Sequence, residues 1–149
     1  MFYSHKLLCT TIVASAISLG CSTSTKPAVP SMTTALLEVT QQNGRACVQV
    51  NDITGYGVLE RDVISINARG NHYYLATVRP GCFDLGISPN ALFDDHFGDV
   101  CGGGVSRLRT GDSHCQIRSV FEFEDREQAF TAHDDALTIR KQSQQKDKP

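Results

Sequence analysis

The residues best equipped for chemistry in this sequence are its six cysteines. A thiol can be acylated, oxidised to a disulfide or bound to a metal, and its surroundings decide which of these occurs. Cys21 stands apart because an apolar run precedes it and a polar stretch follows it, and Cys9 lies inside that apolar run. The body of the chain then contains four more thiols, which are Cys47, Cys82, Cys101 and Cys115.

Residues 1–20 have the organisation of a signal peptide. One Lys and one His precede residues 7–19, an uncharged apolar stretch about two-thirds as long as a membrane span requires. Gly20 provides the small residue that a lipobox needs before its cysteine, although Ser18 stands where Leu is usual. We therefore expect cleavage before Cys21, attachment of a diacylglyceryl group to its thiol, and anchoring to a lipid bilayer.

Two other interpretations of this segment remain open. Cys21 could follow an ordinary secretory signal as a free or paired thiol, or the signal could stay uncleaved as a transmembrane anchor, for which the apolar run is short. In the favoured interpretation, residues 21–34 are the lipidated cysteine and a flexible polar tether that reaches roughly 20 Å. Ser22 resembles the residue that follows the acylated cysteine in outer-membrane lipoproteins. The expected location is the periplasmic side of the bacterial envelope, at the outer rather than the inner membrane.

The four remaining cysteines are expected to form two disulfides, because an even number of thiols in an exported domain is typical of a cross-linked scaffold. Three connectivities are possible. We predict that Cys82 pairs with Cys101, which would close the irregular segment between them. We also predict that Cys47 pairs with Cys115, which would tie the first clear strand to the last.

A metal site is the competing use of some of these residues. Its ligands would come from Cys101, Cys115, His114 and His96, or from the acidic group Asp94, Asp95, His96 and Asp99. Zinc sites usually contain paired ligands at short spacing, and calcium loops have alternating oxygen donors with a distal Glu. Neither pattern occurs, so the sequence predicts no metal and no cofactor.

Nucleophilic catalysis has a weak signal. Asp112, Ser113 and His114 have the residue types of a catalytic triad, but neighbours on a strand point to opposite faces and cannot form its hydrogen-bond chain. Ser106 is a further candidate nucleophile. Residues 102–104 are three glycines, which could admit a ligand to the backbone but more often mark a strand bulge. A small hydrolase or metal-dependent enzyme that uses this Gly-rich region is therefore the alternative function.

Ligand binding has a more plausible basis in Arg107, Arg109 and Tyr74. The two arginines share one face of their expected strand and could contact an anionic partner such as a phospholipid headgroup or a glycan. Tyrosines at positions 56, 73 and 74 could stack on sugars, although alternation sends the last two to opposite faces of a strand.

The elements that must position these residues are mostly short strands. Runs of β-branched and aromatic residues alternate with turns that contain Gly, Asn or Asp, a pattern typical of a meander of hairpins. Strands are predicted at residues 46–50, 53–59, 63–66, 72–78, 100–110 and 115–123. Helices are predicted at residues 34–42 and 124–140, with a single helical turn at 88–93.

The last strand and the last helix should define the core. Alternation would place Cys115, Ile117, Phe121 and Phe123 on one face of the strand. The apolar side of the following helix is thin, so that helix should lie on the sheet surface without forming a second core. The expected fold class is mainly β with minor α. It is a small antiparallel, barrel-like sheet of five or six strands with a C-terminal helix, stapled by disulfides.

Length and charge limit the remaining possibilities. The chain has 149 residues, which suits one domain and not two. We place that domain at residues 35–141, followed by a disordered polar tail at 142–149. After removal of the signal, thirteen Lys and Arg face sixteen Asp and Glu. This balance argues against a nucleic-acid partner, which would require a strongly basic surface. The oligomeric state stays undetermined.

The pattern of cysteines and strands resembles an uncharacterised family of small, four-cysteine proteobacterial lipoproteins, a domain of unknown function. The resemblance covers about residues 36–124. It rests on Arg45-x-Cys47, Val63-Ile64-Ser65-Ile66, Tyr73-Tyr74-Leu75 leading to Cys82-x-x-Leu85, Val100-Cys101, and Cys115-x-Ile117 before an aromatic strand. It implies export and disulfides but no activity.

The function expected from these features is that of a membrane-anchored periplasmic lipoprotein. Its domain is expected to be a non-catalytic binding or interaction module of the cell envelope. Its partners would be the lipid bilayer, through Cys21, and an envelope protein or glycan.

Overall fold

The computed structural model of the protein describes residues 28–82, 91–94, 98–104, 106–110 and 113–146. Within these ranges the chain forms two α-helices, eight strands and two single turns of 3-10 helix, at Val50–Asp52 and Arg69–Asn71. The helices and strands, in chain order, are α1 (Met32–Thr40), β1 (Cys47–Gln49), β2 (Ile53–Glu60), β3 (Val63–Ala68), β4 (Tyr73–Val78), β5 (Ala91–Asp94), β6 (Asp99–Cys101), β7 (Arg107–Thr110), β8 (Ser113–Phe123) and α2 (Arg126–Lys146).

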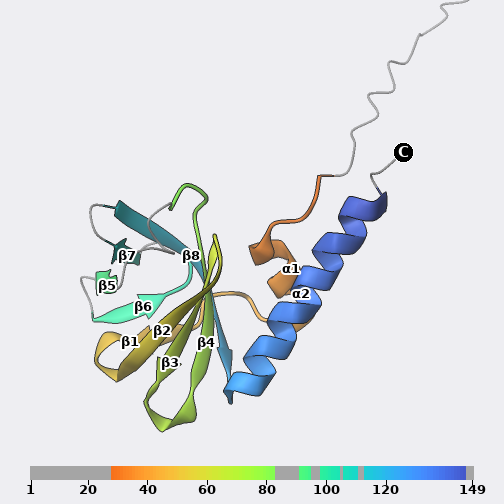
Figure 1. Cartoon of the computed structure of the whole chain (residues 1–149). Coiled ribbons are helices and arrows are strands. Elements are labelled where there is room, and N and C mark those ends of the chain that lie inside the picture. The colour runs from red at the N-terminus through yellow and green to blue at the C-terminus, as the bar shows by residue number, and fades with distance from the viewer. Residues whose placement is uncertain (1–27, 83–90, 95–97, 105, 111–112, 147–149) are drawn as a thin grey trace, which may run out of the picture.

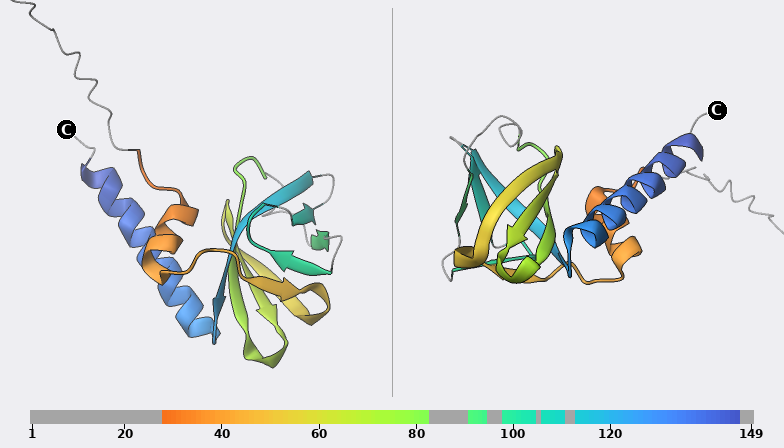
Figure 2. Two further views of the ribbon diagram at one scale, coloured as in Figure 1. Left: turned by 180° about the vertical axis from the view of Figure 1, so that it is seen from behind. Right: turned by 60° about the horizontal axis from the view of Figure 1, so that its bottom comes forward.

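Six strands form one sheet, in the order β2-β3-β4-β8-β7-β5, and every neighbouring pair is antiparallel. β1 and β6 form a separate two-stranded ladder. The large sheet curls into a half-barrel, and both helices lie together on one side of it (Figures 1 and 2). The predicted fold class, a small antiparallel barrel-like sheet with a C-terminal helix and disulfides, is confirmed.

β8 changes the core that it faces partway along its length. Ile117 lies in the core inside the half-barrel, whereas Phe121 and Phe123 pack with the helices. The register between β4 and β8 shifts between Thr77 and Val78. One extra residue in a strand reverses the side to which every later side chain points. The expectation that all the apolar residues of this strand share one face is therefore wrong.

Two hydrophobic cores result. The barrel core is formed by Val48, Ile64, Ile66, Tyr74, Ala76, Val78, Val100, Leu108, Cys115, Ile117 and Val120. The helix core lies between α1, α2 and the outer face of the sheet, and it is formed by Met32, Ala35, Leu36, Val63, Tyr73, Leu75, Phe121, Phe123, Ala129, Ala132 and Ala136. The prediction that the last helix forms no second core is wrong, because α1 adds apolar residues to its thin stripe.

Both helices differ from their expected limits: α1 lies two residues earlier than predicted, and α2 begins two residues later and ends six residues later. α1 begins at Met32, inside the predicted tether, because Ser31 caps it and Met32 is fully buried in the helix core. α2 continues to Lys146, so part of the predicted disordered tail is helical. Residues 141–146 are Lys, Gln and Ser without Gly or Pro, so nothing in this segment stops the helix.

Residues 91–94 form a strand, not the end of the expected helical turn. β5 pairs with β7 from Ala91 opposite Thr110 to Asp94 opposite Arg107. Pairing with a neighbouring strand outweighs the local tendency to form a turn after Pro89. The first part of the expected turn, residues 88–90, lies outside the described residues.

The four cysteines do form two disulfides, but with a different connectivity from the predicted one. Cys47 is bonded to Cys101, and Cys82 to Cys115. The first pair lies directly opposite across the β1–β6 ladder, with Cα atoms 4.1 Å apart. The Cα atoms of the second pair are 5.6 Å apart. The predicted pairs followed position along the chain, whereas strand pairing decides which thiols meet.

The edge of β8 that does not pair with β4 is covered by several other segments. β7 pairs with its beginning, and further along the backbone N–H of Gly103 donates to Arg118. The N–H of Val120 donates to Gly44. At the far end, the side-chain amide of Gln42 makes two hydrogen bonds to the backbone of Glu122, at 2.8 and 3.0 Å.

Among the described residues, no helix is long and apolar enough to cross a membrane.

Candidate functional site

Three exposed arginines lie on the outward side of β7 and β8. Arg107 and Arg109 are both exposed, because alternate residues of β7 point outward while Leu108 and Thr110 are buried. On β8 the same alternation exposes His114 and Arg118 and leaves Gln116 half-buried. These residues, together with Arg79, form what we call the arginine face: Arg79, Arg107, Arg109, His114, Gln116 and Arg118.

Strand pairing brings the members of the arginine face together. Arg107 lies opposite Gln116 and Arg109 lies opposite His114 in the β7–β8 register. Arg79 reaches Gln116 from the other side, since its backbone N–H donates to the carbonyl of Gln116 at 3.0 Å just beyond the end of β4. Gln116 therefore lies between two arginines that are 28 positions apart in the chain.

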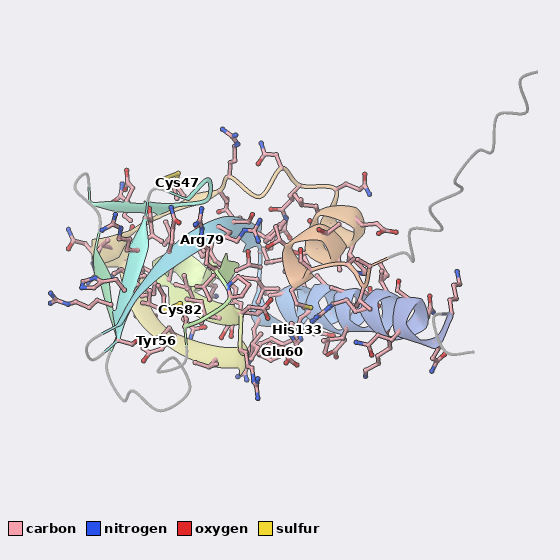
Figure 3. The ribbon with its side chains drawn as sticks, turned by 90° about the horizontal axis from the view of Figure 1, so that it is seen from above. Cys47, Tyr56, Glu60, Arg79, Cys82 and His133 are labelled. Carbon is pink, nitrogen blue, oxygen red and sulfur yellow. A yellow bond between two sulfur atoms is a disulfide. The ribbon has the colours of Figure 1, made fainter. Side chains whose placement is uncertain are left out.

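A hollow of about 380 Å³ lies on this face, next to the Cys82–Cys115 disulfide. It is lined by Arg79, Pro80, Gly81, Cys82, Arg107, His114 and Gln116. Figure 3 shows Arg79 and Cys82 over the barrel, away from His133 and α2. The Cys82–Cys115 bond holds residues 79–82 against β8. The backbone positions of Arg79 and Arg107, whose guanidinium groups line the hollow, are therefore fixed.

The chemistry of the hollow is that of a donor site. Among the described residues, its polar lining consists of two guanidiniums, an imidazole and the amide of Gln116, and no carboxylate lines it. The Gln116 amide nitrogen also donates to the carbonyl of Gly104. Among the described residues, none of the four arginines of the face forms an ion pair. Guanidinium groups bind phosphate and carboxylate oxygens in a bidentate geometry. The arginine face is therefore suited to an anionic group with several oxygens.

Tyr74, which the sequence grouped with Arg107 and Arg109, does not join them. It is only 6 % exposed and lies in the barrel core. Its hydroxyl donates to Oε1 of Glu122 at 3.1 Å, near the opposite end of β8. The pKa of Tyr74 is raised to about 12, mainly because the phenol is buried and also because the Glu122 carboxylate accepts its hydrogen bond and lies beside it. A structural role in the core replaces the predicted binding role.

The candidate nucleophile Ser106 and the described candidate base His114 do not come together. Ser106 is fully buried, and its hydroxyl accepts a hydrogen bond from the backbone N–H of Cys101 at 2.9 Å. His114 is exposed on the outward side of β8. The two residues therefore lie on opposite sides of the sheet, and no described geometry supports proton transfer between them.

The glycines at 102–104 serve the packing of the backbone. A Cβ atom on Gly102 would collide with the carbonyl oxygen of Gly44, and it would lie 2.7 Å from the backbone nitrogen of Val120. Gly103 and Gly104 have φ angles of 117° and 87°, which favour glycine. The backbone of Gly44 and Val120 occupies the space beside Gly102. Glycine is therefore needed here so that the chain can pack against itself, and not so that a ligand can approach.

Several candidate residues lie outside the described residues: Cys21, Asp95, His96 and Asp112. Asp99 is half-buried in β6. Within the described ranges, no three or more His, Cys, Asp or Glu side chains form a group that could hold a metal ion.

Sequence reasoning missed three members of the arginine face, which are Arg79, Gln116 and Arg118. Arg118 could have been found, since it continues the alternation of His114 and Gln116 along β8. Arg79 carries no such signal, because only the pairing of β4 with β8 brings it beside Gln116.

Comparison with known proteins gives one match. The model of a family described as "Family of unknown function (DUF6491)" matches residues 4–140. Neither the curated proteins nor the solved structures contain a match.

Proposed function

Because the chain belongs to DUF6491, a family of unknown function, we infer its role from its own residues. We propose that it is an exported lipoprotein, anchored through Cys21 on the periplasmic side of the bacterial outer membrane. We further propose that its domain is a non-catalytic module, and that its arginine face binds the phosphate groups of anionic phospholipids. The arginine face is the observation that carries this proposal.

The disulfides support export. All four cysteines of the domain are bonded, and Cys47 is exposed to solvent. Cytosolic reductants keep exposed thiols reduced, whereas the periplasm oxidises them. A domain with this chemistry fits the compartment to which the signal peptide and lipobox would send it.

The charge of the arginine face supports a phospholipid ligand. Each Lys or Arg close to an anionic bilayer contributes about 1 kcal/mol to binding. Four arginines would therefore add about 4 kcal/mol, which is too weak to hold a free protein firmly but sufficient to orient an anchored one. Acylation would supply the remaining affinity.

The arrangement of the elements is compatible with this orientation. In Figure 1 the chain at residue 28 lies beside the helices, on the opposite side of the molecule from β7, and both lie in the upper half of the view. The carbonyl of Pro30 accepts a hydrogen bond from Arg140, so the tether from Cys21 would be shorter than expected and would reach roughly 15 Å. The anchor and the arginine face could therefore meet one bilayer if the upper side of the molecule in this view faces it.

Metabolic labelling with palmitate tests the anchor. The wild-type chain should incorporate label and the Cys21→Ala chain should not. Equal labelling of the two chains would disprove acylation at this residue, without bearing on the arginine face.

Vesicle sedimentation of the unacylated Cys21→Ala chain tests the arginine face. The chain should bind vesicles that contain phosphatidylglycerol and not vesicles of phosphatidylcholine alone. Adding Arg79→Gln with Arg107→Gln should weaken binding about 30-fold, as expected for the loss of two charges at about 1 kcal/mol each.

A matched control removes two exposed arginines outside the face, through Arg69→Gln with Arg126→Gln. The control should retain the affinity of its parent. Equal losses in the two double variants would show that net charge alone drives binding, and the arginine face would then not be a site.

A further inference from the structure

A larger groove lies at the other end of β8, where the sheet meets both helices. Its volume is about 910 Å³. It is lined by Val39, Thr40, Gln42, His72, Glu122, Phe123, Glu124, Asp125, Glu127, Gln128, Thr131, Ala132 and Asp135. We call it the helix groove. Nothing in the proposed function uses it.

The helix groove combines an apolar floor with an acidic rim. Val39, Phe123 and Ala132 provide apolar surface. Among the described residues, five carboxylates line the groove and no Lys or Arg does; the carboxylates are Glu122, Glu124, Asp125, Glu127 and Asp135. The positive end of α2 opposes them with about half a charge, and the negative end of α1 at Thr40 offsets that contribution. The groove is therefore strongly negative.

Some of these carboxylates already have partners. Glu122 accepts the hydroxyl hydrogen of Tyr74 and lies 3.3 Å from Nδ1 of His72. Asp125 accepts a hydrogen bond from the N–H of Gln128 at 2.8 Å, which caps the start of α2. Among the described residues, Glu124, Glu127 and Asp135 form no ion pair. Three carboxylates on the rim are thus available to an external cation.

The walls of the groove are held in place without a ligand. The Gln42 side chain pairs with the backbone of Glu122, which ties the end of α1 to β8. The backbone N–H of Glu124 donates to Oε1 of Gln128 at 3.0 Å, which ties β8 to α2. A preformed groove binds at a lower entropic cost than one that must be ordered.

The size and spacing of the groove indicate a peptide and not a metal ion. The described carboxylates do not gather into a group that could hold a metal. Asp125 directly precedes α2 and Asp135 follows ten positions later within it, which corresponds to about 15 Å along the helix. An extended peptide covers this distance with four to five residues at about 3.3 Å each.

We propose that the helix groove binds a short cationic peptide segment of a partner protein, with its Lys or Arg side chains against Glu127 and Asp135 and its apolar residues against Phe123 and Val39. Lys and Arg fit such a surface because their aliphatic stems lie on apolar atoms while their charges stay at the rim. The segment binds in an extended conformation along the first three turns of α2.

Isothermal titration calorimetry of the full unacylated Cys21→Ala chain tests the proposal. The probes are three acetylated, amidated pentapeptides with the sequences Lys-Leu-Lys-Leu-Lys, Lys-Gly-Lys-Gly-Lys and Glu-Leu-Glu-Leu-Glu. The first should bind, the second should bind several-fold more weakly because it lacks apolar residues, and the third should not bind. Absence of binding by the first peptide, or equal binding by all three, would overturn the proposal.

Variants locate the site. Glu127→Gln with Asp135→Asn should weaken binding of the Lys-Leu peptide about ten-fold, as expected for the loss of two exposed charge pairs. Glu38→Gln with Glu60→Gln removes the same charge from outside the groove and should change affinity less than about two-fold.

Thr131→Arg places a positive charge at an exposed position within the lining of the groove. It should abolish binding, because the new side chain fills the groove and repels a cationic peptide. Unchanged binding in Thr131→Arg, or equal losses in the two double variants, would contradict the assignment.

Discussion

The two ends of β8 differ in charge, in composition and in what holds them together. The end that carries the arginine face is positive, and both disulfides belong to the barrel part of the molecule. The end that carries the helix groove is negative and lies under α1 and α2, where no described disulfide occurs. One strand thus runs from a covalently stapled region to a region held by packing.

A small domain buries little apolar surface, and the two regions compensate for this in different ways. The β1–β6 ladder has only three residue pairs, so it contributes little burial, and the Cys47–Cys101 bond supplements it. The helix core instead uses small residues. Ala35, Ala129, Ala132 and Ala136 are all nearly or fully buried, and they allow the helices to approach the sheet and each other closely. Cross-links compensate where the core is thin, and close packing suffices where two helices cover the sheet.

Removing a disulfide gives the largest expected effect. The Cys82→Ala/Cys115→Ala and Cys47→Ala/Cys101→Ala variants should each lose about 4 kcal/mol of unfolding free energy, because each bond closes a long loop in the unfolded chain. Urea denaturation followed by circular dichroism measures the loss. A loss below about 1 kcal/mol in both variants would show that packing alone holds the barrel.

Peptide mapping of the unreduced protein separately tests the connectivity. Proteolytic fragments should be linked as Cys47–Cys101 and Cys82–Cys115. Fragments linked in either of the other two arrangements would contradict the strand pairing that brings these residues together.

Leu36→Ala tests the end held by packing. Leu36 is fully buried in the helix core, so its truncation should cost about 3 kcal/mol and leave a cavity between α1 and the sheet. Hydrogen exchange should increase in α1 and α2 before it increases in β3 and β4. A uniform increase across the molecule would show that the two ends unfold as one unit and would remove the distinction drawn between them.

The Tyr74–Glu122 contact predicts a smaller, pH-dependent effect. The pKa of Tyr74 in the folded protein is raised to about 12 from its ordinary value of 10.0. The neutral phenol therefore stabilises the folded state fully below pH 10, and this contribution is lost as the pH rises from 10 through 12. Tyr74→Phe should reduce the fall in unfolding free energy over this range.

Glu122→Gln is the companion variant, because it keeps the phenol and removes the carboxylate that accepts its hydrogen bond. It should lessen the alkaline fall by less than Tyr74→Phe does, since burial is the larger cause of the raised pKa. Identical profiles for wild type and Tyr74→Phe would show that the phenol does not control alkaline stability.

The smallest effects are expected in cross-tests, in which variants of one surface are assayed for binding at the other surface. Arg79→Gln with Arg107→Gln should change binding of the Lys-Leu peptide less than about two-fold, since exposed charges beyond a Debye length of about 8 Å are largely screened at physiological salt. Glu127→Gln with Asp135→Asn should likewise leave phosphatidylglycerol binding nearly unchanged. A large effect in either cross-test would mean that the two surfaces act as one.

Much of the fold could be predicted from local patterns. Alternation located β2, β3, β4 and β8, and turn residues separated them. The predicted disulfide-forming residues were right, since all four thiols of the domain are bonded. Arg107 and Arg109 were correctly placed on one side of a strand, because β7 follows regular alternation.

The errors fall where a distant segment decides the local structure. The shift between Thr77 and Val78 turns the second half of β8 toward the helices, and no residue within β8 signals it. Tyr74 was grouped with the arginines by residue type, whereas its position opposite Glu122 places it in the barrel core. Arg79 reached the arginine face only through its bond to Gln116.

The sequence by itself determined both helices and the strands β2, β3, β4 and β8, the disulfide-forming residues and most of the alternation of buried and exposed positions, because these depend on the period of a strand or helix and on residues close in the chain. It did not predict β5, and it predicted one strand at residues 100–110 where β6 and β7 belong to different sheets. The tertiary structure alone decided which cysteines pair, which core each half of β8 faces and which charges gather into a surface. Those outcomes depend on register between strands that are far apart in sequence, and a shift of one residue changes all of them.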